Sequence, residues 1–251
     1  MARILTQETS LTRKRVALLK EVSALSWLVR VEGVAAGILL AAGAWRYLFH
    51  QHAGLWWAGC AVAALWGGHL LKIRQNQREE KHVQWGLQGE REMNRILEET
   101  LDNSHYVIND LLVRIGRKTA QVDHVIISPR GLFAIETKNW GGHIEGDENE
   151  DSWTQKSRMD RPPLPRSNPI KQVRRHVEFL AGKLKQAGMD WPDIRGLVVF
   201  TSPKATWYVH NATQEILTPR EAAAAIARFQ GGRTYSESEV TAVVNLFMRE
   251  A

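Results

Sequence analysis

Two apolar segments joined by a turn limit the folds that this chain can adopt. Residues 122–128 read VDHVIIS and residues 131–137 read GLFAIET, and both are rich in β-branched or apolar side chains. The residues that join them, SPRG, are typical of a tight turn. The two segments are therefore predicted to pair as a β-hairpin, and HYVINDLLV at 105–113 is expected to lie alongside.

The rest of the second half of the chain alternates between helical and strand patterns. Asn168 is predicted to cap a helix whose first residue is Pro169, and Thr218 with Glu221 three residues later forms a capping box. The order of elements predicts an α/β domain whose mixed sheet is flanked by helices. The predicted helices are 86–101, 168–187, 218–229 and 236–250, and a further buried strand is predicted at 194–202.

The first quarter of the chain contains two apolar runs. Residues 53–71 carry no formal charge over a length close to the roughly 20 residues that span a bilayer as a helix. The run before it, 27–49, is apolar in its middle, and only HQH at 50–52 separates the two. This pattern predicts a two-helix membrane hairpin. A soluble helical hairpin packed against the rest of the protein is the alternative.

Basic residues flank this hairpin on both sides and are nearly absent from its short loop, where only Arg46 is close. Because Lys and Arg favour the cytoplasmic side, both chain ends are expected to be cytoplasmic, in an inner or plasma membrane. The flanking basic residues are Arg3, Arg13, Lys14, Arg15 and Lys20 before the hairpin and Lys72, Arg74, Arg78 and Lys81 after it.

Composition limits the chemistry. The chain of 251 residues has one cysteine, Cys60, which excludes a disulfide framework and a thiolate zinc site within a monomer. The net charge of +6 gives a mild indication of an anionic partner, although basic membrane flanks produce the same total.

The predicted β-hairpin brings ionisable residues together. Asp123 begins one strand and Glu136 ends the other, with Lys138 two residues further on the same face. A salt bridge between Glu136 and Lys138 is one explanation. Two neighbouring carboxylates also favour a divalent cation such as Mg²⁺, and a lysine beside them offers positive charge to a phosphoryl group. Such a set suits phosphodiester hydrolysis.

These residues also carry a resemblance to a known family. QVDHVIIS…GLFAIETKNW is similar to the D-x(n)-E-x-K core of the PD-(D/E)xK nuclease superfamily. With GLQGE, YVINDL, GGHIEG, Trp153 and NPIKQ, it resembles the NERD domain, a nuclease-related domain, over residues 86 to about 201. The proline of the superfamily's name is replaced by Val122.

The resemblance implies a restriction-endonuclease-like sheet and cleavage of DNA that depends on Mg²⁺ or Mn²⁺. It assigns metal binding to Asp123 and Glu136, the helix acid of the site to Glu90, and the catalytic lysine to Lys138. Gln172 of NPIKQ matches a polar helix residue found in some members. Taken alone, Glu90 could be an acid favoured by the start of a helix. His124 points away from Asp123 by strand alternation and is expected to be structural.

Two loops are predicted between the core elements. GDENEDSW at 146–153 is acidic, and the following segment, 156–169, is basic, rich in proline and expected to be irregular. Basic residues of this region could hold a DNA backbone, or they could form a solvated surface. The candidates are Lys156, Arg158, Arg166, Lys171, Arg174 and Arg175.

Together these patterns predict a membrane-anchored Mg²⁺-dependent nuclease acting on DNA, with a catalytically silent nucleic-acid- or protein-binding module as the alternative. Lost activity would leave the acid set without a chemical purpose, which favours the enzyme. The expected segments are an N-terminal helix at 1–25, the membrane hairpin at 26–72, a linker at 73–85, the nuclease-like domain at 86–202 and C-terminal elements at 203–251.

Overall fold

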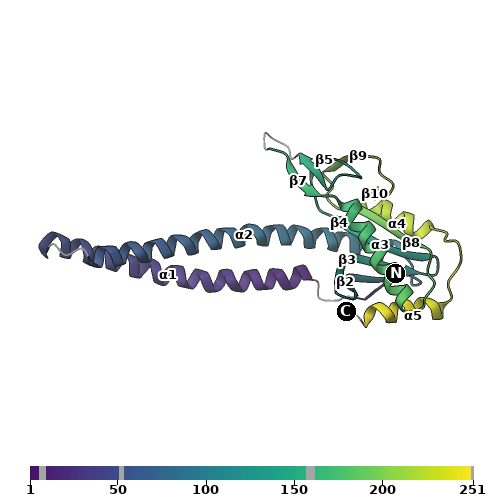
Figure 1. Cartoon of the computed structure of the whole chain (residues 1–251), viewed down its shortest axis with the longest axis horizontal. Coiled ribbons are helices and arrows are strands. Elements are labelled where there is room, and N and C mark those ends of the chain that lie inside the picture. The colour runs from purple at the N-terminus through teal and green to yellow at the C-terminus, as the bar shows by residue number, and fades with distance from the viewer. Residues whose placement is uncertain (6–9, 51–53, 157–161, 250–251) are drawn as a thin grey trace. The chain divides into compact units, whose positions relative to one another are not determined.

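The computed structural model describes residues 1–5, 10–50, 54–156 and 162–249 (Figure 1). The chain divides into two compact units. One unit is Ser10–Trp85, and the other combines Met1–Thr9 with Gly86–Ala251.

The first unit is a pair of antiparallel helices. Helix α1 is Ser10–His50, and α2 begins at Gly54 and continues to Thr100, so that its last turns belong to the second unit. The predicted linker at 73–85 therefore lies within an uninterrupted helix. Ion pairs connect the two helices along their length: Lys14–Glu79 at 2.8 Å, Arg15–Glu80 at 2.8 Å, Glu21–Lys72 at 3.8 Å and Glu32–His69 at 2.7 Å.

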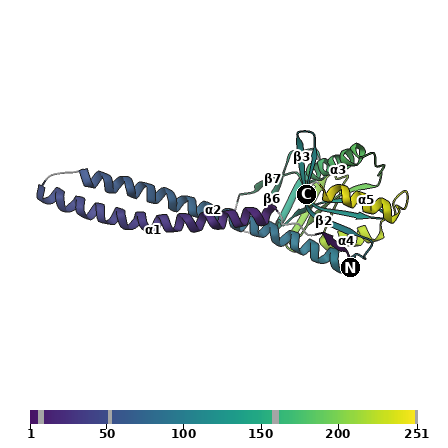
Figure 2. The ribbon, with the colours of Figure 1, turned by 90° about the horizontal axis from the view of Figure 1, so that it is seen from below.

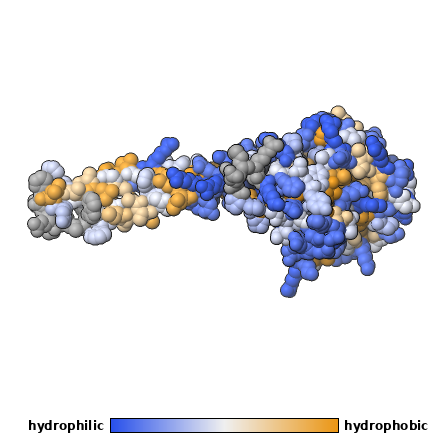
Figure 3. Space-filling model, turned by 90° about the horizontal axis from the view of Figure 1, so that it is seen from above, coloured by the Kyte–Doolittle hydropathy of each residue, from blue (hydrophilic) through white to orange (hydrophobic). Residues whose placement is uncertain are grey.

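The helical hairpin is present, but the structure supports only one candidate membrane span. Among the described residues, Ser10–Leu48 is long and apolar enough to cross a bilayer, and only 6% of its apolar stretch is buried. The predicted second span begins beside residues 51–53, which lie outside those described. Hydrophobic side chains cover much of the visible surface of this hairpin (Figure 3).

The second unit is built on a six-stranded mixed sheet, which confirms the predicted α/β class with a mixed sheet flanked by helices. Its order is β1-β2-β3-β4-β8-β10. Strands β2, β3 and β4 pair antiparallel, while β1–β2, β4–β8 and β8–β10 pair parallel. The strands are β1 (Arg3–Leu5), β2 (Tyr106–Ile115), β3 (Lys118–Ser128), β4 (Gly131–Lys138), β8 (Ile194–Phe200) and β10 (Glu215–Leu217).

Helices cover both faces of this sheet (Figure 2). Helices α3 (Pro169–Gln186) and α5 (Glu237–Met248) share one hydrophobic cluster with side chains such as Val125, Ile127 and Val198. The end of α2 and helix α4 (Pro219–Arg228) share a second cluster with Ile126 and Phe133. The alternation of strand residues between the two clusters produces this three-layer arrangement.

The caps predicted from the sequence are present. Asn168 accepts hydrogen bonds from the backbone N–H groups of Ile170 and Lys171, and Thr218 with Glu221 forms the capping box. Such caps can be predicted from the sequence alone, because each capping side chain accepts hydrogen bonds from backbone N–H groups in the first turn of its own helix.

Three expectations are wrong. The N-terminal helix predicted at 1–25 begins only at Ser10, and Arg3–Leu5 instead form β1, paired with β2 at the edge of the sheet. The acidic and basic segments predicted as loops contribute strands to a second sheet. Its order is β7-β6-β5-β9, and its strands are β5 (Gly142–Asp147), β6 (Ser152–Lys156), β7 (Leu164–Ser167) and β9 (Ala205–His210).

Polar composition concealed this second sheet, because one of its faces is exposed. Only a few inward-facing side chains, including Ile144 and Trp153, are buried. In β9 the exposed and half-buried residues alternate along the whole strand. A sheet that is solvated on one face gives a weak apolar signal in each short strand.

Candidate active site

The site is centred where β3 and β4 separate. The two strands are paired from Ser128–Gly131 to His124–Ile135. Beyond that point the backbone N–H and the hydroxyl of Thr137 donate to Oδ2 of Asp123, at 2.8 and 2.9 Å. The carboxylate thus takes a hydrogen bond that a strand carbonyl would otherwise accept, which fixes Asp123 beside the end of β4.

The alternation of β3 changes at the same place. Ala120 and Val122 lie in the same hydrophobic cluster as Val125 and Ile127, so the strand changes phase between them. Position 110 of β2, which lies opposite Asp123, has a positive φ of 54°. The simple alternation used to place Asp123 therefore fails at this residue, because both strands are locally irregular.

His124 is buried, and its Nδ1 lies 2.8 Å from Oδ1 of Asn109 on the neighbouring strand. Burial lowers the pKa of His124 to about 4, so the ring is neutral at physiological pH. This environment agrees with the structural role expected for His124.

Glu136 is almost fully buried, with 4% exposure, and its Oε1 accepts a hydrogen bond from Lys138 Nζ. The salt bridge considered from the sequence is therefore present. Burial, followed by the nearby charge of Asp123, raises the pKa of Glu136 to about 7, although Lys138 opposes that rise. The carboxyl consequently gains or loses a proton near neutral pH.

Glu90 approaches this group from α2, close to the end of β8. A Cβ placed on the preceding residue, Gly89, would lie 2.5 Å from Thr201 Oγ1 and 3.0 Å from Asn139 Cβ. The glycine thus allows the helix to approach the strand ends closely. Burial, and then the negative charge of Asp123, raises the pKa of Glu90 to about 8.

One buried residue of the site was missed. His176 of α3 places Nδ1 3.4 Å from Oε2 of Glu136, and that nitrogen forms no hydrogen bond with the described residues. Burial lowers its pKa to about 4. The signal in the sequence was its position one helical turn after Gln172, which puts both side chains on one face of α3.

The Oε1 atom of Gln172 is also buried without a hydrogen-bond partner among the described residues. Buried polar atoms are normally satisfied, so an unpaired acceptor indicates a place for water or a ligand. The role that the resemblance implied for Gln172 stays a prediction.

The acids of this cluster supply oxygen ligands of the kind that Mg²⁺ uses in proteins. Besides burial, the negative charge of Asp123 raises the carboxyl pKa values of both Glu136 and Glu90. A divalent cation would relieve this mutual repulsion. Mg²⁺ commonly uses one or two carboxylates together with waters and phosphate oxygens. Within the described ranges, no group of three or more His, Cys, Asp or Glu side chains is placed so that it could hold a metal ion.

Other residues of the motifs hold the structure around the site. A Cβ on Gly146 would lie 2.2 Å from the indole of Trp153, whose Nε1 donates to the carbonyl oxygen of Asp147 at 2.9 Å. The Asn168 side-chain amide donates to the carbonyl oxygens of Asp147, Glu148 and Glu150 while its Oδ1 caps α3. Gly146, Trp153 and Asn168 therefore have structural roles, and the ionisable candidates for catalysis are other residues of the motifs.

Several of the predicted DNA-binding residues have protein partners. Lys156 pairs with Glu145 and Lys171 with Asp151, each at 2.6 Å. Arg174 pairs with buried Glu148.

Two of these predicted residues have different surroundings, and one is not described. Arg175 donates to the carbonyl oxygen of Thr119 at 2.9 Å. Arg166 instead lies over the ring of Trp140, and Lys138 Nζ is near the same ring. Arg158 lies outside the described residues.

Comparison with known proteins gives one family match and one curated relative. Residues 85–201 match the family model of the nuclease-related domain, NERD, which supports membership of that family. An uncharacterized protein of Bacillus anthracis is 33% identical over 117 residues, which cover 45% of this chain and 54% of that protein. The chain thus spans about half the length of this curated relative. No solved structure gives a match.

The matched segment contains all five residues predicted for catalysis, together with His176 and Thr137. Residues 85–201 are therefore similar to the nuclease-related domain, and within them Asp123, Glu136 and Lys138 lie together at the end of one strand pair.

Proposed function

We propose that this protein hydrolyses phosphodiester bonds of DNA with the help of Mg²⁺ or Mn²⁺. The observation that carries the proposal is the placement of three acids and Lys138 around the point where β3 and β4 separate. Raised carboxyl pKa values caused by burial and mutual repulsion are typical of functional sites. The proposal places the domain in the PD-(D/E)xK superfamily.

In this mechanism Asp123 and Glu136 hold the metal, with Glu90 as a further acid. A bound Mg²⁺ supplies Lewis-acid polarisation of a phosphate oxygen and lowers the pKa of a bound water. Lys138 stabilises negative charge that develops on the phosphoryl group. Thr137 fixes the orientation of Asp123 through two hydrogen bonds, and His176 contacts the far oxygen of Glu136.

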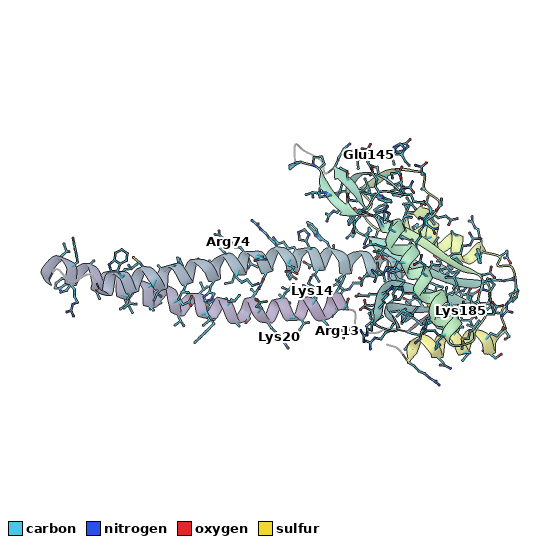
Figure 4. The ribbon with its side chains drawn as sticks, in the orientation of Figure 1. Arg13, Lys14, Lys20, Arg74, Glu145 and Lys185 are labelled. Atoms are coloured by element: carbon cyan, nitrogen blue, oxygen red, sulfur yellow. The ribbon has the colours of Figure 1, made fainter. Side chains whose placement is uncertain are left out.

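The same proposal includes attachment to a membrane through the helical hairpin at 26–72. An apolar helix in the core of a soluble protein is mostly buried. The apolar stretch of the candidate span is only 6% buried, so a lipid bilayer would remove its exposed surface from water. Basic side chains of both helices lie along the polar part of the hairpin, including Arg13, Lys20 and Arg74 (Figure 4). They favour a cytoplasmic position for both termini and for the nuclease-related domain.

A binding module without catalytic activity is the second candidate. The ion pair between Glu136 and Lys138 favours it, because each group already has a partner before any substrate or metal binds. A scaffold of this kind would keep the fold and bind nucleic acid or protein at the membrane.

Cleavage by the full chain in detergent separates the two candidates. The full chain is preferable because β1 comes from the N-terminus and pairs with the sheet of the nuclease-related domain. Supercoiled and linear DNA are incubated with Mg²⁺ or Mn²⁺, and Asp123→Ala and Lys138→Ala are compared with the unchanged protein. Cleavage that both substitutions abolish supports the nuclease. Binding of DNA without cleavage by any of the three proteins supports the module.

A further inference from the structure

The ring of Trp140 has two cations near it, Lys138 of the candidate active site and Arg166. Trp140 follows the strand that carries Glu136 and Lys138 and is half-buried against Phe200, with ring centres 5.7 Å apart. Lys138 Nζ lies 5.7 Å from the centre of the Trp140 ring, and the guanidinium carbon of Arg166 lies 5.5 Å from the same point. Arg166 comes from β7 of the smaller sheet, which Figure 1 shows beside the main sheet.

Arg166 is held in place by a chain of contacts. Its Nε donates to Oε1 of Gln155 at 2.7 Å, and the Gln155 amide donates to the carbonyl oxygen of Gly141 at 2.6 Å. Gln155 is 8% exposed, so the polar group that orients Arg166 is itself buried. Arg166 faces Trp153 across β6 and β7, on the inner side of the smaller sheet.

This arrangement differs from that of the other predicted DNA-binding residues that the structure describes. Lys156, Lys171 and Arg174 each pair with a carboxylate, and Arg175 donates to a backbone carbonyl. Arg166 contacts a neutral amide and an aromatic ring, and neither of these partners neutralises its positive charge. A guanidinium is suited to phosphate because its planar donors can form two parallel hydrogen bonds.

We propose that Arg166 binds a backbone phosphate of the DNA strand next to the phosphate held at Lys138. This inference rests on the proposed function and adds a specific contact to it. One strand of B-DNA carries a phosphate about every 3.4 Å along the helix axis, so two cations beside one indole ring can reach neighbouring phosphates. The β6–β7 pair is then the arm that fixes the position of the strand relative to Asp123 and Glu136.

DNA binding is measured on the full chain in detergent with a fluorescent duplex, without divalent metal and over a range of salt concentrations. Arg166→Ala is expected to weaken binding about tenfold and to reduce the salt slope by about 0.9, the change expected when one phosphate contact is lost. Arg166→Lys is expected to keep the salt slope and to lose part of the affinity, because the charge stays but the two-pronged geometry does not.

Arg233→Ala is the matched control, because Arg233 also lies over an aromatic ring, that of Tyr235, but its charge is paired with Glu239. Unchanged binding by Arg233→Ala and weakened binding by Arg166→Ala support the contact. Equal effects of the two substitutions, or an unchanged salt slope in Arg166→Ala, overturn it. An unchanged protein that binds no DNA also overturns it.

Cleavage is measured separately, so that failure of the proposed function can be distinguished from failure of this contact. If the unchanged protein binds DNA through Arg166 but does not cut it with Mg²⁺, the contact stands and the nuclease activity does not. If it cuts, Arg166→Ala is expected to raise KM for DNA with a smaller change in kcat. Thermal unfolding of Arg166→Ala and Arg166→Lys verifies that both variants are folded.

Discussion

Thr137 donates both its backbone N–H and its hydroxyl to a single carboxylate oxygen of Asp123, at 2.8 and 2.9 Å. The contact replaces a backbone bond at the place where β3 and β4 cease to pair. It orients one acid of the candidate site from the adjacent strand without adding any charge, and therefore leaves the other oxygen available to a metal or water.

Replacing Thr137 by Val is expected to weaken this orientation. Hydrogen bonds to charged groups contribute about 1.5–3 kcal/mol, so the loss of the hydroxyl should reduce cleavage by about tenfold or more. Thr137→Ser retains the hydroxyl and serves as the control. Cleavage rates at saturating Mg²⁺ provide the measurement, and equal activity of the Val and Ser variants would contradict the role given to the hydroxyl.

Gly89→Ala is expected to move Glu90 away from the site. The added Cβ would lie 2.5 Å from Thr201 Oγ1, which can rotate, but also 3.0 Å from Asn139 Cβ, which is fixed by the backbone. Overpacking of this kind typically costs about 1–3 kcal/mol. The expected result is a lower melting temperature together with weaker stabilisation by Mg²⁺.

Gly37→Ala is the control for this helix substitution, since nothing lies within 4 Å of a Cβ at that position. It should leave both the melting temperature and the response to Mg²⁺ close to those of the unchanged protein. If Gly89→Ala gives the same values as Gly37→Ala, the close approach of α2 is not needed to position Glu90.

Stabilisation by Mg²⁺ is expected to increase between about pH 6.5 and about pH 8. The raised pKa values of Glu136, about 7, and Glu90, about 8, mean that the folded metal-free protein binds more protons than the unfolded chain in this range. Its stability from these groups therefore falls as pH rises. The lowered pKa of His176 acts below about pH 6.5, where it makes stability rise with pH.

A bound cation replaces the protons that the carboxyl groups lose, so its effect should be greatest at the alkaline end of the range. Melting temperatures with and without millimolar Mg²⁺ across this pH range give the measurement. A Glu90→Gln, Glu136→Gln variant should lose the pH-dependent part of the response. A response to Mg²⁺ that falls toward alkaline pH would contradict the assignment of these acids as ligands.

Arg174→Ala is expected to destabilise the protein by about 1–3 kcal/mol, because it removes a charged partner from a buried carboxylate. Glu148 is 4% exposed and also accepts hydrogen bonds from the backbone N–H and the hydroxyl of Thr213. Lys171→Ala is the comparison, since Lys171 pairs with highly exposed Asp151 and should change stability little. Denaturant unfolding of the two variants provides the test, and equal midpoints would be inconsistent with a structural role for Arg174.

Local chemistry explains which features could be predicted from the sequence. The capping residues Asn168 and Thr218 act within one helical turn, and the SPRG turn joins two strongly apolar strands. The strand that ends in Glu136 and Lys138 and the family motifs around it could likewise be recognised from short segments. These short segments were sufficient to predict the mixed α/β fold and to select the candidate acids.

The main strands, the helix starts and the residue types available for chemistry could be predicted, because they depend on neighbours along the chain. The pairing of Arg3–Leu5 with β2 could not be predicted, and neither could the second sheet, whose short strands have one solvated face. The contacts of His176 with Glu136 and of Arg166 with Trp140 also depend on the folded domain. Such contacts join residues far apart in sequence, and only packing of the complete domain brings them within reach of each other.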